Sequence, residues 1–180
     1  TDSLFPALAP QSVVAFADIA AVVVSCLMIM SFSGKIRNRK NKKLYVVSEW
    51  SNELFVFRAD GRIFSLIQSL PLLPGNVTGA AAAAIRLSRD EHFLYISVRG
   101  LNQLITVDLT QEKAAVADSV SSAGVHPRDF IISPDGRFLL IANRQEGGIV
   151  CRETEPESGR VKEVRSRITM PEAVSVILEE

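Results

Sequence analysis

The sequence predicts an all-β fold built from repeated four-stranded units, and three observations lead to this prediction. Segments Lys43–Glu49, Phe93–Arg99 and Phe138–Arg144 superimpose with steps of 50 and 45 residues. A period near 45 residues indicates either propeller blades or pairs of helices. Each unit consists of short runs rich in Val, Ile, Tyr and Phe that are separated by turn residues, and such runs favour strands. The architecture expected is therefore a β-propeller rather than a helical solenoid.

The last unit is the best defined. The turn Ser133-Pro134-Asp135-Gly136 joins its first two strands, because Pro presets φ, Asp bonds to its own backbone and Gly accepts a positive φ. A similar turn, Pro156–Gly159, joins its last two strands. The four strands expected in this unit are approximately Arg128–Ile132, Phe138–Asn143, Gly148–Glu153 and Val161–Ser166.

The two preceding units follow the same plan less completely. The middle unit has Ser88–Glu91 in the turn position, without Pro or Gly, and its expected strands are Ala82–Leu87, Phe93–Val98, Gln103–Leu109 and Ala114–Val120. The first unit has three recognisable strands, Leu44–Ser48, Leu54–Ala59 and Arg62–Leu70. Its innermost strand should precede Leu44, where the chain instead has Ser33–Lys40. We therefore expect about three blades of an incomplete ring over residues 43–180, behind a divergent apolar segment and a basic linker at residues 1–42.

The apolar segment Val13–Phe32 is just long enough to cross a bilayer, and the basic cluster that follows it would satisfy the positive-inside rule. Asp18 weakens that interpretation, because a carboxylate is costly in lipid. A secretory signal is disfavoured, since the first basic residue is Lys35, on the wrong side of the segment. We favour a buried or unrelated segment, and a membrane anchor remains the alternative.

Composition sets further bounds. The chain has 180 residues, 47% of them hydrophobic, so it can bury a sizeable core and is too apolar to be disordered. Its 20 basic and 20 acidic side chains give no net charge, which argues against a dedicated nucleic-acid binder. Cys26 and Cys151 stand far apart, and no Cys or His pair has the spacing of metal ligands, so neither a disulfide scaffold nor a zinc site is expected.

Four runs of the sequence resemble segments of one known protein family and occur in the same order as in that family. The segments "LYVVSEWSNELFVF", "TGAAAAAIRLSRDEHFLYISVRG", "HPRDFIISPDGRFLLIANRQ" and "MPEAVSVILEE" together resemble the C-terminal half of the lactonase family of seven-bladed β-propellers. This family includes bacterial 6-phosphogluconolactonase and the fungal muconate-lactonizing enzymes. The resemblance covers residues 43–178. It implies hydrolysis of a sugar-acid lactone, without a metal or an organic cofactor.

The resemblance also implies site residues. The family's acidic residue corresponds to Glu49, and two family arginines correspond to Arg99 and to Arg128 in the element Pro127–Phe130. Asn52 of the first motif and His126, beside the second arginine, are the candidates for binding substrate, although for His126 we favour a turn residue without a chemical role. A Gly-Pro-Arg-His element of the family falls on Ser31–Gly34 and is missing here, and with it an arginine and a histidine.

Lactone hydrolysis explains why such residues are wanted. A base must deprotonate the attacking water, and positive charge must stabilise the oxygen that becomes negative. Glu49 is the candidate base, Arg99 the candidate partner of the anion, and Arg128 supports it. Three functions stay open: a cytoplasmic lactonase weakened by its altered Ser31–Gly34, a non-catalytic propeller fragment that binds proteins or associates with itself through exposed blade edges, and a muconate-type lactonizing cycloisomerase.

Overall fold

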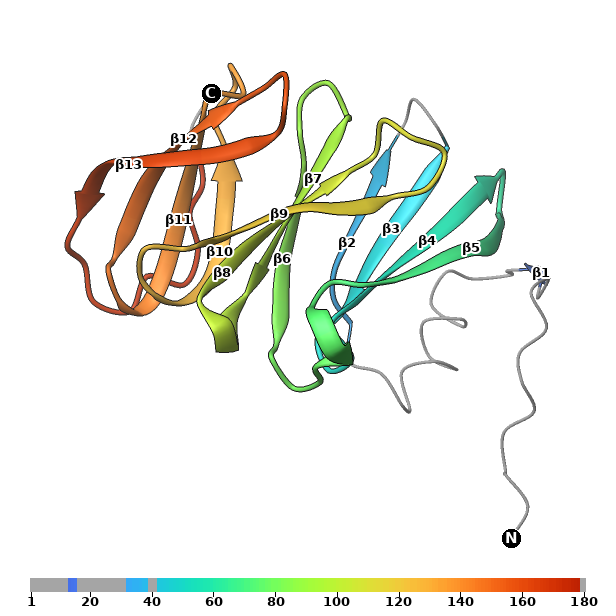
Figure 1. Cartoon of the computed structure of the whole chain (residues 1–180), viewed down its shortest axis with the longest axis horizontal. Coiled ribbons are helices and arrows are strands. Elements are labelled where there is room, and N and C mark those ends of the chain that lie inside the picture. Colours follow the sequence, from blue (N-terminus) through green and yellow to red (C-terminus); the bar gives the residue numbers. More distant parts are fainter. Residues whose placement is uncertain (1–12, 16–31, 39–41, 179–180) are drawn as a thin grey trace, which may run out of the picture.

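The computed structural model describes residues 13–15, 32–38 and 42–178 of the chain. Three antiparallel sheets follow one another along the sequence and stand side by side like the blades of a fan (Figure 1). Among the described residues, the only helical elements are two short 3-10 turns, η1 (Pro74–Asn76) and η2 (Arg99–Leu101). The expected all-β architecture of about three blades in an incomplete ring is confirmed.

The first blade has the strand order β1-β5-β4-β3-β2. A short strand, β1, pairs antiparallel with β5 and adds a fifth strand at the outer edge of this blade. The innermost strand is β2, which pairs with β3. The strands are β1 (Val13–Ala15), β2 (Phe32–Asn38), β3 (Lys43–Ser48), β4 (Glu53–Asp60) and β5 (Ile63–Pro71).

The second and third blades each have four strands in sequence order. The second contains β6 (Ala82–Leu87), β7 (Phe93–Val98), β8 (Gln103–Asp108) and β9 (Ala115–Ser121). The third contains β10 (Val125–Ile132), β11 (Phe138–Glu146), β12 (Ile149–Glu155) and β13 (Arg160–Ile168). Every expected strand is present, with ends that differ by a few residues.

One expectation about the first blade is wrong. We expected a basic linker where β2 lies, yet these residues form the innermost strand of the blade, in antiparallel register with β3 from Phe32↔Ser48 to Asn38↔Lys43. The reason lies in the alternation of the side chains, because Lys35 and Arg37 are exposed whereas Ile36 is half-buried and Asn38 is buried. The basic side chains thus lie in solvent on one face of the strand, while the backbone pairs with β3.

Most of the apolar segment Val13–Phe32 lies outside the described residues. Its role as an anchor therefore remains a prediction. Within the part that the structure does describe, no helix has the length and apolar character needed to cross a membrane.

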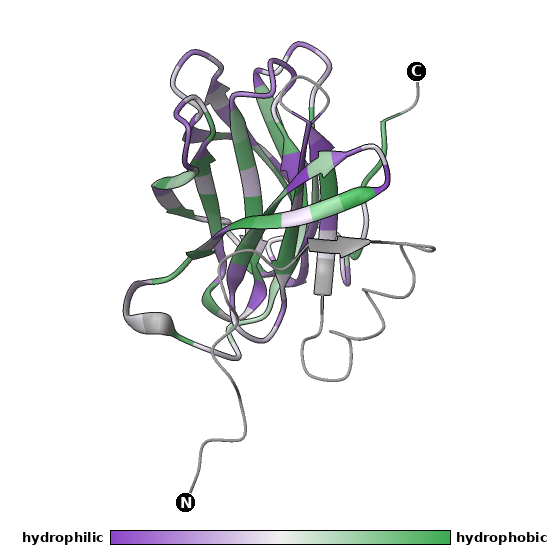
Figure 2. Cartoon of the chain, turned by 90° about the vertical axis from the view of Figure 1, so that its right-hand side faces the viewer, coloured by the Kyte–Doolittle hydropathy of each residue, from purple (hydrophilic) through white to green (hydrophobic). Residues whose placement is uncertain are grey.

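The core is divided between two blade interfaces, and the middle blade contributes to both. Leu94, Ile96 and Val98 of β7 belong to the apolar cluster shared with the first blade, while Phe93 and Tyr95 belong to the cluster shared with the third. All six residues of β7 are buried, because alternate side chains of a strand point to opposite faces. Apolar residues concentrate in the strands and polar residues in the turns (Figure 2).

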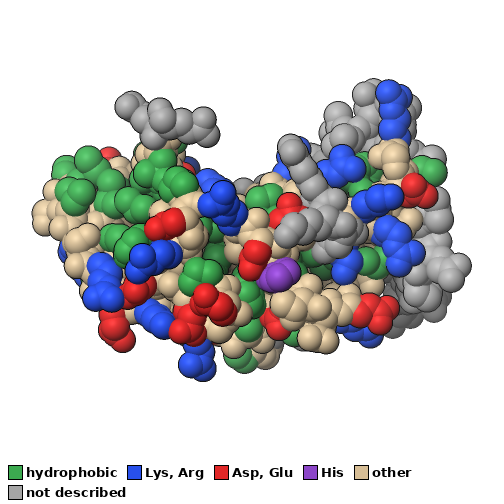
Figure 3. All heavy atoms as spheres, turned by 90° about the horizontal axis from the view of Figure 1, so that it is seen from above, with side chains coloured by type: hydrophobic (Ala, Val, Ile, Leu, Met, Phe, Trp, Pro, Cys, Tyr) green, Lys and Arg blue, Asp and Glu red, His purple; other side chains and the backbone are tan. Residues whose placement is uncertain are grey.

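The outward faces of the two outer blades are less well covered. Leu44 and Phe55 on the first blade, and Leu140 on the third, are only half-buried. Seen from above, hydrophobic side chains gather over the end of the molecule where the third blade lies (Figure 3). These faces are what an incomplete ring leaves open.

Two equivalent asparagines join consecutive blades. Asn52 and Asn102 have positive φ values of 52° and 55° and end the first turn after the second strand of their blades. The Oδ1 atom of Asn52 accepts a hydrogen bond from the backbone N–H of Ala82 at 3.0 Å, and that of Asn102 accepts one from His126 at 2.7 Å. Each asparagine therefore fastens the start of the next blade's innermost strand.

We expect Asn102→Ala to destabilise the chain by about 2 to 3 kcal/mol. The variant leaves the N–H of His126 without its acceptor. It also places alanine at a positive φ, which asparagine tolerates better because its polar side chain can bond to the nearby backbone. Asn102→Asp is the matched control, since it keeps both the oxygen and the tolerance of this backbone conformation. Urea denaturation measures both variants. Equal losses for Ala and Asp would contradict the role of the acceptor.

Candidate active site

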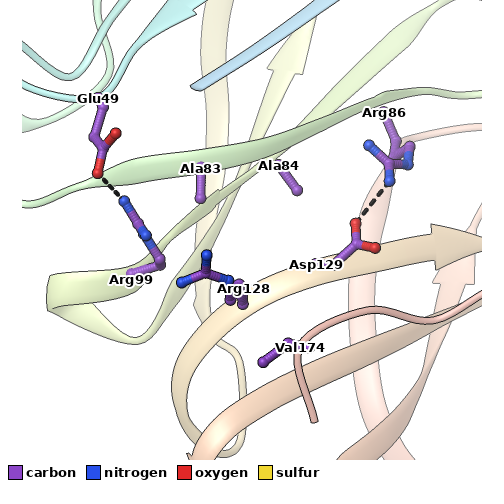
Figure 4. Close-up of a pocket in the computed structure, with 8 residues that line it drawn as sticks. All are labelled: Glu49, Ala83, Ala84, Arg86, Arg99, Arg128, Asp129 and Val174. Atoms are coloured by element: carbon purple, nitrogen blue, oxygen red, sulfur yellow. Dashed lines mark hydrogen bonds and ion pairs between the residues drawn. The ribbon is translucent and has the colours of Figure 1, made fainter. Parts of the chain in front are cut away.

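The residues that follow the second strands of the first and middle blades meet the innermost strands of the middle and third blades around an open pocket of about 430 Å³ (Figure 4). Charged side chains dominate the lining, and three small or apolar residues complete it. The lining residues are Glu49, Ala83, Ala84, Arg86, Arg99, Arg128, Asp129 and Val174.

Glu49 and Arg99 form an ion pair across the interface between the first and middle blades. They occupy the same position of the repeat, directly after β3 and β7, so the stacking of blades brings them together. The side chain of Arg99 is 14% exposed and that of Glu49 is 36% exposed. The guanidinium is thus largely enclosed, whereas the carboxylate stays accessible from the pocket, and the two residues expected to carry the chemistry are in contact.

The backbone around Arg99 explains how its side chain is held. The N–H groups of Arg99 and Gly100 donate hydrogen bonds to the carbonyl groups of Ala81 and Ala80 at 3.0 and 2.8 Å. A Cβ atom at Gly100 would lie 2.8 Å from the oxygen of Ala80, so this close approach requires glycine. The sequence Val98-Arg99-Gly100 therefore fixes Arg99 against the preceding loop.

Bulges direct the innermost strands toward the pocket. The register of β6 against β7 shifts between Ala82 and Ile85, and the two residues inside this irregularity, Ala83 and Ala84, line the pocket. In β10 the register shifts between Pro127 and Asp129, and Arg128 lies at this position. Since a bulge turns a side chain out of the regular alternation, it presents Arg128 to the pocket.

A second ion pair joins Arg86 of β6 to Asp129 of β10, with Nη2 and Oδ1 2.6 Å apart. The guanidinium of Arg86 also lies over the ring of Phe130 at 5.8 Å. In Figure 4 the side chain of Arg128 lies between the two ion pairs. Among the described residues Arg128 has no ion-pair partner, and it is exposed.

His126 lies just before Arg128 with a positive φ of 62°, held by its hydrogen bond to Asn102. Burial lowers the pKa of His126 below its ordinary value of 6.5, and the positive charges of Arg99, Arg144 and Arg128 lower it further. Its Nε2 atom is buried and has no hydrogen-bond partner among the described residues. The pKa of His126 thus depends on the charges of the arginines near the pocket, although His126 is not one of the lining residues.

Asn52 was expected to bind substrate, but the structure does not place it in the pocket. The residue is buried, with 1% of its surface exposed. Its Oδ1 atom accepts the N–H of Ala82, and its Nδ2 atom donates to the carbonyl of Val77 at 3.0 Å. The amide is therefore occupied by the joint between blades, a role that the recurrence of Asn52 and Asn102 at a step of 50 residues could have indicated.

Five lining residues were not anticipated, and two of them, Ala83 and Ala84, reach the pocket through the bulge in β6. Asp129 directly follows Arg128 in the element Pro127–Phe130, and Val174 lies in the terminal run "MPEAVSVILEE". Both therefore belong to segments that the sequence had already marked. Arg86 belongs to no motif. The pairing of β6 with β7 and the stacking of the blades place it opposite Asp129. Its role follows from tertiary structure.

The position of the family's missing element is now defined. By strand register, Ser33 of β2 corresponds to Ala83 and Arg128, and Gly34 corresponds to Ala84 and Asp129. A Cβ atom at Gly34 would lie 2.6 Å from Cγ2 of Ile85 and 3.0 Å from the oxygen of Ala83. The neighbouring blade thus packs too tightly here for a larger side chain without a shift of Ile85.

The pocket chemistry suits an anion. Three guanidinium groups and two carboxylates line it, and both carboxylates are paired, which leaves one cation available. In the ranges that the structure describes, no three His, Cys, Asp or Glu side chains gather as metal ligands would. The accessible carboxylate of Glu49 beside Arg99 offers a base next to a group that can stabilise negative charge.

Comparisons with known proteins show which family the sequence resembles. A family model described as lactonase, 7-bladed beta-propeller, matches residues 32–178. The 6-phosphogluconolactonase of Bacillus subtilis (strain 168) is 30% identical over 142 residues, which are 76% of this chain and 41% of that protein. A 6-phosphogluconolactonase of Formosa agariphila is 30% identical over 140 residues, 64% of this chain and 40% of its own length.

Two solved structures have a fold similar to that of this chain. The periplasmic gluconolactonase of Pseudomonas aeruginosa superimposes with a TM-score of 0.74 and 27% identity, covering 80% of this chain and 41% of that one. A putative 6-phosphogluconolactonase from Bacteroides fragilis gives a TM-score of 0.72 at 25% identity, with 79% and 40% coverage. The chain therefore spans about two fifths of the length of these relatives.

The depressed pKa of His126 leads to a titration experiment. We expect its imidazole to titrate below 6.5 by NMR, and we expect Arg128→Gln to raise that pKa because the variant removes a neighbouring positive charge. Since the folded-state pKa lies below the unfolded value, the folded state loses stability as the pH falls from that value through the folded pKa. This loss should shrink in Arg128→Gln.

Arg128→Lys is the control, because it keeps the charge and should keep the pKa low. An imidazole pKa at or above 6.5 in the wild-type chain would contradict the electrostatic account of this site.

Proposed function

Because this chain belongs to the lactonase family of seven-bladed β-propellers, we propose that its pocket binds a sugar-acid lactone and hydrolyses the ester bond. One observation carries the proposal. Both carboxylates of the pocket are paired with arginines of the middle blade, which leaves Arg128 free to bind an anionic group of the substrate. A guanidinium can bind a phosphate or a carboxylate through two parallel hydrogen bonds.

The proposed reaction adds one water to the lactone. Glu49 accepts a proton from the water as its oxygen attacks the ester carbonyl, and Arg99 stabilises the negative charge that develops on the carbonyl oxygen. The bond between the acyl carbon and the ring oxygen then breaks, and the leaving oxygen takes up the proton that Glu49 received, which returns Glu49 to its carboxylate form. The product is the open hydroxy acid. The ion pair between Glu49 and Arg99 must loosen when the substrate enters, because both groups then face the reacting carbonyl.

The substrate that we propose is 6-phosphogluconolactone. The name of the relative from Bacillus subtilis supports a phosphorylated lactone, whereas the name of the relative from Pseudomonas aeruginosa indicates gluconolactone. Arg128 favours the phosphorylated form, because it offers an exposed cation without an ion-pair partner among the described residues. Comparing the two lactones therefore tests the role of this arginine.

We expect the isolated chain to hydrolyse lactones little faster than buffer does. Ser33 and Gly34 stand where the family pattern has an arginine and a histidine, and the tight contact of Gly34 with Ile85 supports the loss of the larger group. Removing one positioned acid or base typically costs about a hundred- to ten-thousand-fold in rate, and removing one oxyanion donor about a hundred- to a thousand-fold.

A pH-stat assay on 6-phosphogluconolactone tests this prediction with three proteins: wild type, Glu49→Gln and Arg99→Ala. Wild-type hydrolysis should exceed buffer only slightly, and both variants should remove the excess. Robust turnover that survives both substitutions would contradict the assigned residues. Robust turnover that either variant abolishes would show that the altered Ser33–Gly34 position is dispensable.

The open outer faces favour a second candidate function, which is association with protein. Large hydrophobic side chains remain exposed in the third blade and after it, at Ile168, Met170, Val174, Ile177 and Leu178. Such a surface suits self-association or docking of another protein. The cycloisomerase alternative uses the same groups, so product analysis of the lactone assay separates it from hydrolysis.

We also propose a cytoplasmic location, which a phosphorylated substrate favours, although one solved relative is named as periplasmic. Carbonate extraction followed by gel filtration tests location and association together. We expect the chain in the supernatant and eluting as more than a monomer. Recovery only in detergent would establish the membrane anchor instead, and a strictly monomeric chain would contradict self-association.

A further inference from the structure

One carboxylate on β10 connects three separate parts of the chain. Oδ1 of Asp129 accepts the hydrogen bond from Arg86 of the middle blade at 2.6 Å. Oδ2 accepts hydrogen bonds from the Ser175 hydroxyl at 3.0 Å and, more weakly, from the backbone N–H of Val176 at 3.5 Å. The side chain of Asp129 is only 16% exposed. It therefore links the middle blade, the third blade and the chain that follows β13.

The stretch of residues 171–178, here called the C-terminal segment, has few other attachments. In the described part of the chain it pairs with no strand. Ala173 is buried, whereas Val174 is 48% exposed and Ile177 is 81% exposed. Val174 nevertheless forms one wall of the pocket (Figure 4). This wall thus depends on a short segment whose described hydrogen bonds all go to Asp129.

The same carboxylate also fixes the neighbouring arginine. Arg86 donates from Nη1 to the carbonyl of Ile85 at 2.9 Å and from Nη2 to Asp129, with its guanidinium over Phe130. These contacts hold Arg86 against the pocket wall rather than toward its centre. Because Arg86 is engaged in this way, it does not compete with Arg128 for an anion.

We propose that Asp129 is a positioning residue that holds the C-terminal segment against the pocket, so that Val174 sets the size of the ligand that the pocket accepts. Hydrogen bonds to an ionised carboxylate are stronger than those between neutral groups, and the low exposure of Asp129 limits competition from water. The assignment of a size limit rests on the proposed lactone site, whereas the attachment of the segment does not.

NMR amide order parameters of Val174, Ser175 and Val176 in the full chain test the attachment. We expect wild-type values near those of β10, roughly 0.8, and values below about 0.6 in Asp129→Asn and in Ser175→Ala. Ser175→Thr restores the hydroxyl and should restore the order. Glu153→Gln is the matched control, because it breaks an ion pair with Arg165 on the same blade without touching the segment.

Each outcome decides the proposal. Values that stay high in Asp129→Asn or in Ser175→Ala would overturn it, and so would an equal loss of order throughout β10 to β13, since Asp129 would then stabilise the blade rather than position the segment. Should Asp129→Asn fail to fold, the comparison of Ser175→Ala with Ser175→Thr decides alone.

Calorimetric binding of 6-phosphogluconate separates this inference from the proposed function. We expect Ser175→Ala to weaken binding about tenfold and Ser175→Thr to restore it, with Glu153→Gln equal to wild type. If the wild-type chain binds no 6-phosphogluconate, the proposed function fails, while the order parameters still decide the role of Asp129. If Ser175→Ala lowers the order parameters of the C-terminal segment but leaves the affinity for 6-phosphogluconate unchanged, the role of Val174 in limiting the size of the ligand would be overturned.

Discussion

The packing of the middle blade against both neighbours is the constraint on which the rest of the structure depends. β7 sends Leu94, Ile96 and Val98 to one interface and Phe93 and Tyr95 to the other. A slip of one residue would exchange these two sets, so the register is fixed by apolar burial on both faces. Once the register is fixed, the residues that end equivalent strands come to the same end of adjacent blades.

That geometry produces the electrostatics of the pocket. Glu49 and Arg99 meet because they occupy one repeat position, and Arg86 meets Asp129 because two innermost strands lie side by side. Each pair spans a different blade interface, so the blades are linked by charge at the pocket as well as by apolar packing. Arg128 is presented between the pairs by a bulge, and among the described residues it has no ion-pair partner.

Much of this fold could be predicted from the sequence, because a repeat of 45 to 50 residues and the chemistry of its turns are local signals. The turn at Ser133–Gly136 shows this, since Gly136 takes the positive φ of 74° that was expected of it. In the middle blade Glu91 occupies the same position with a φ of 63°, so the turn survives without glycine. β2 was missed because its basic residues suggested a solvated linker, although they alternate as the exposed face of a strand requires.

The candidate site was only partly predictable. Glu49, Arg99 and Arg128 follow from motifs and do line the pocket. Asp129 adjoins Arg128 in the same motif, whereas the place of Arg86 depends on which strands become neighbours, and no local pattern encodes that. Asn52 was assigned to substrate because it lies within a motif, yet burial commits its amide to the joint between blades.

The claim that Arg128 binds the anionic group of a lactone is tested most directly by a crystal structure of the chain with 6-phosphogluconate. We predict the phosphate within hydrogen-bonding distance of the Arg128 guanidinium and the carboxylate end of the ligand beside Glu49 and Arg99. A ligand that binds elsewhere on the blades, or that lies in the pocket with its phosphate turned away from Arg128, would contradict the account.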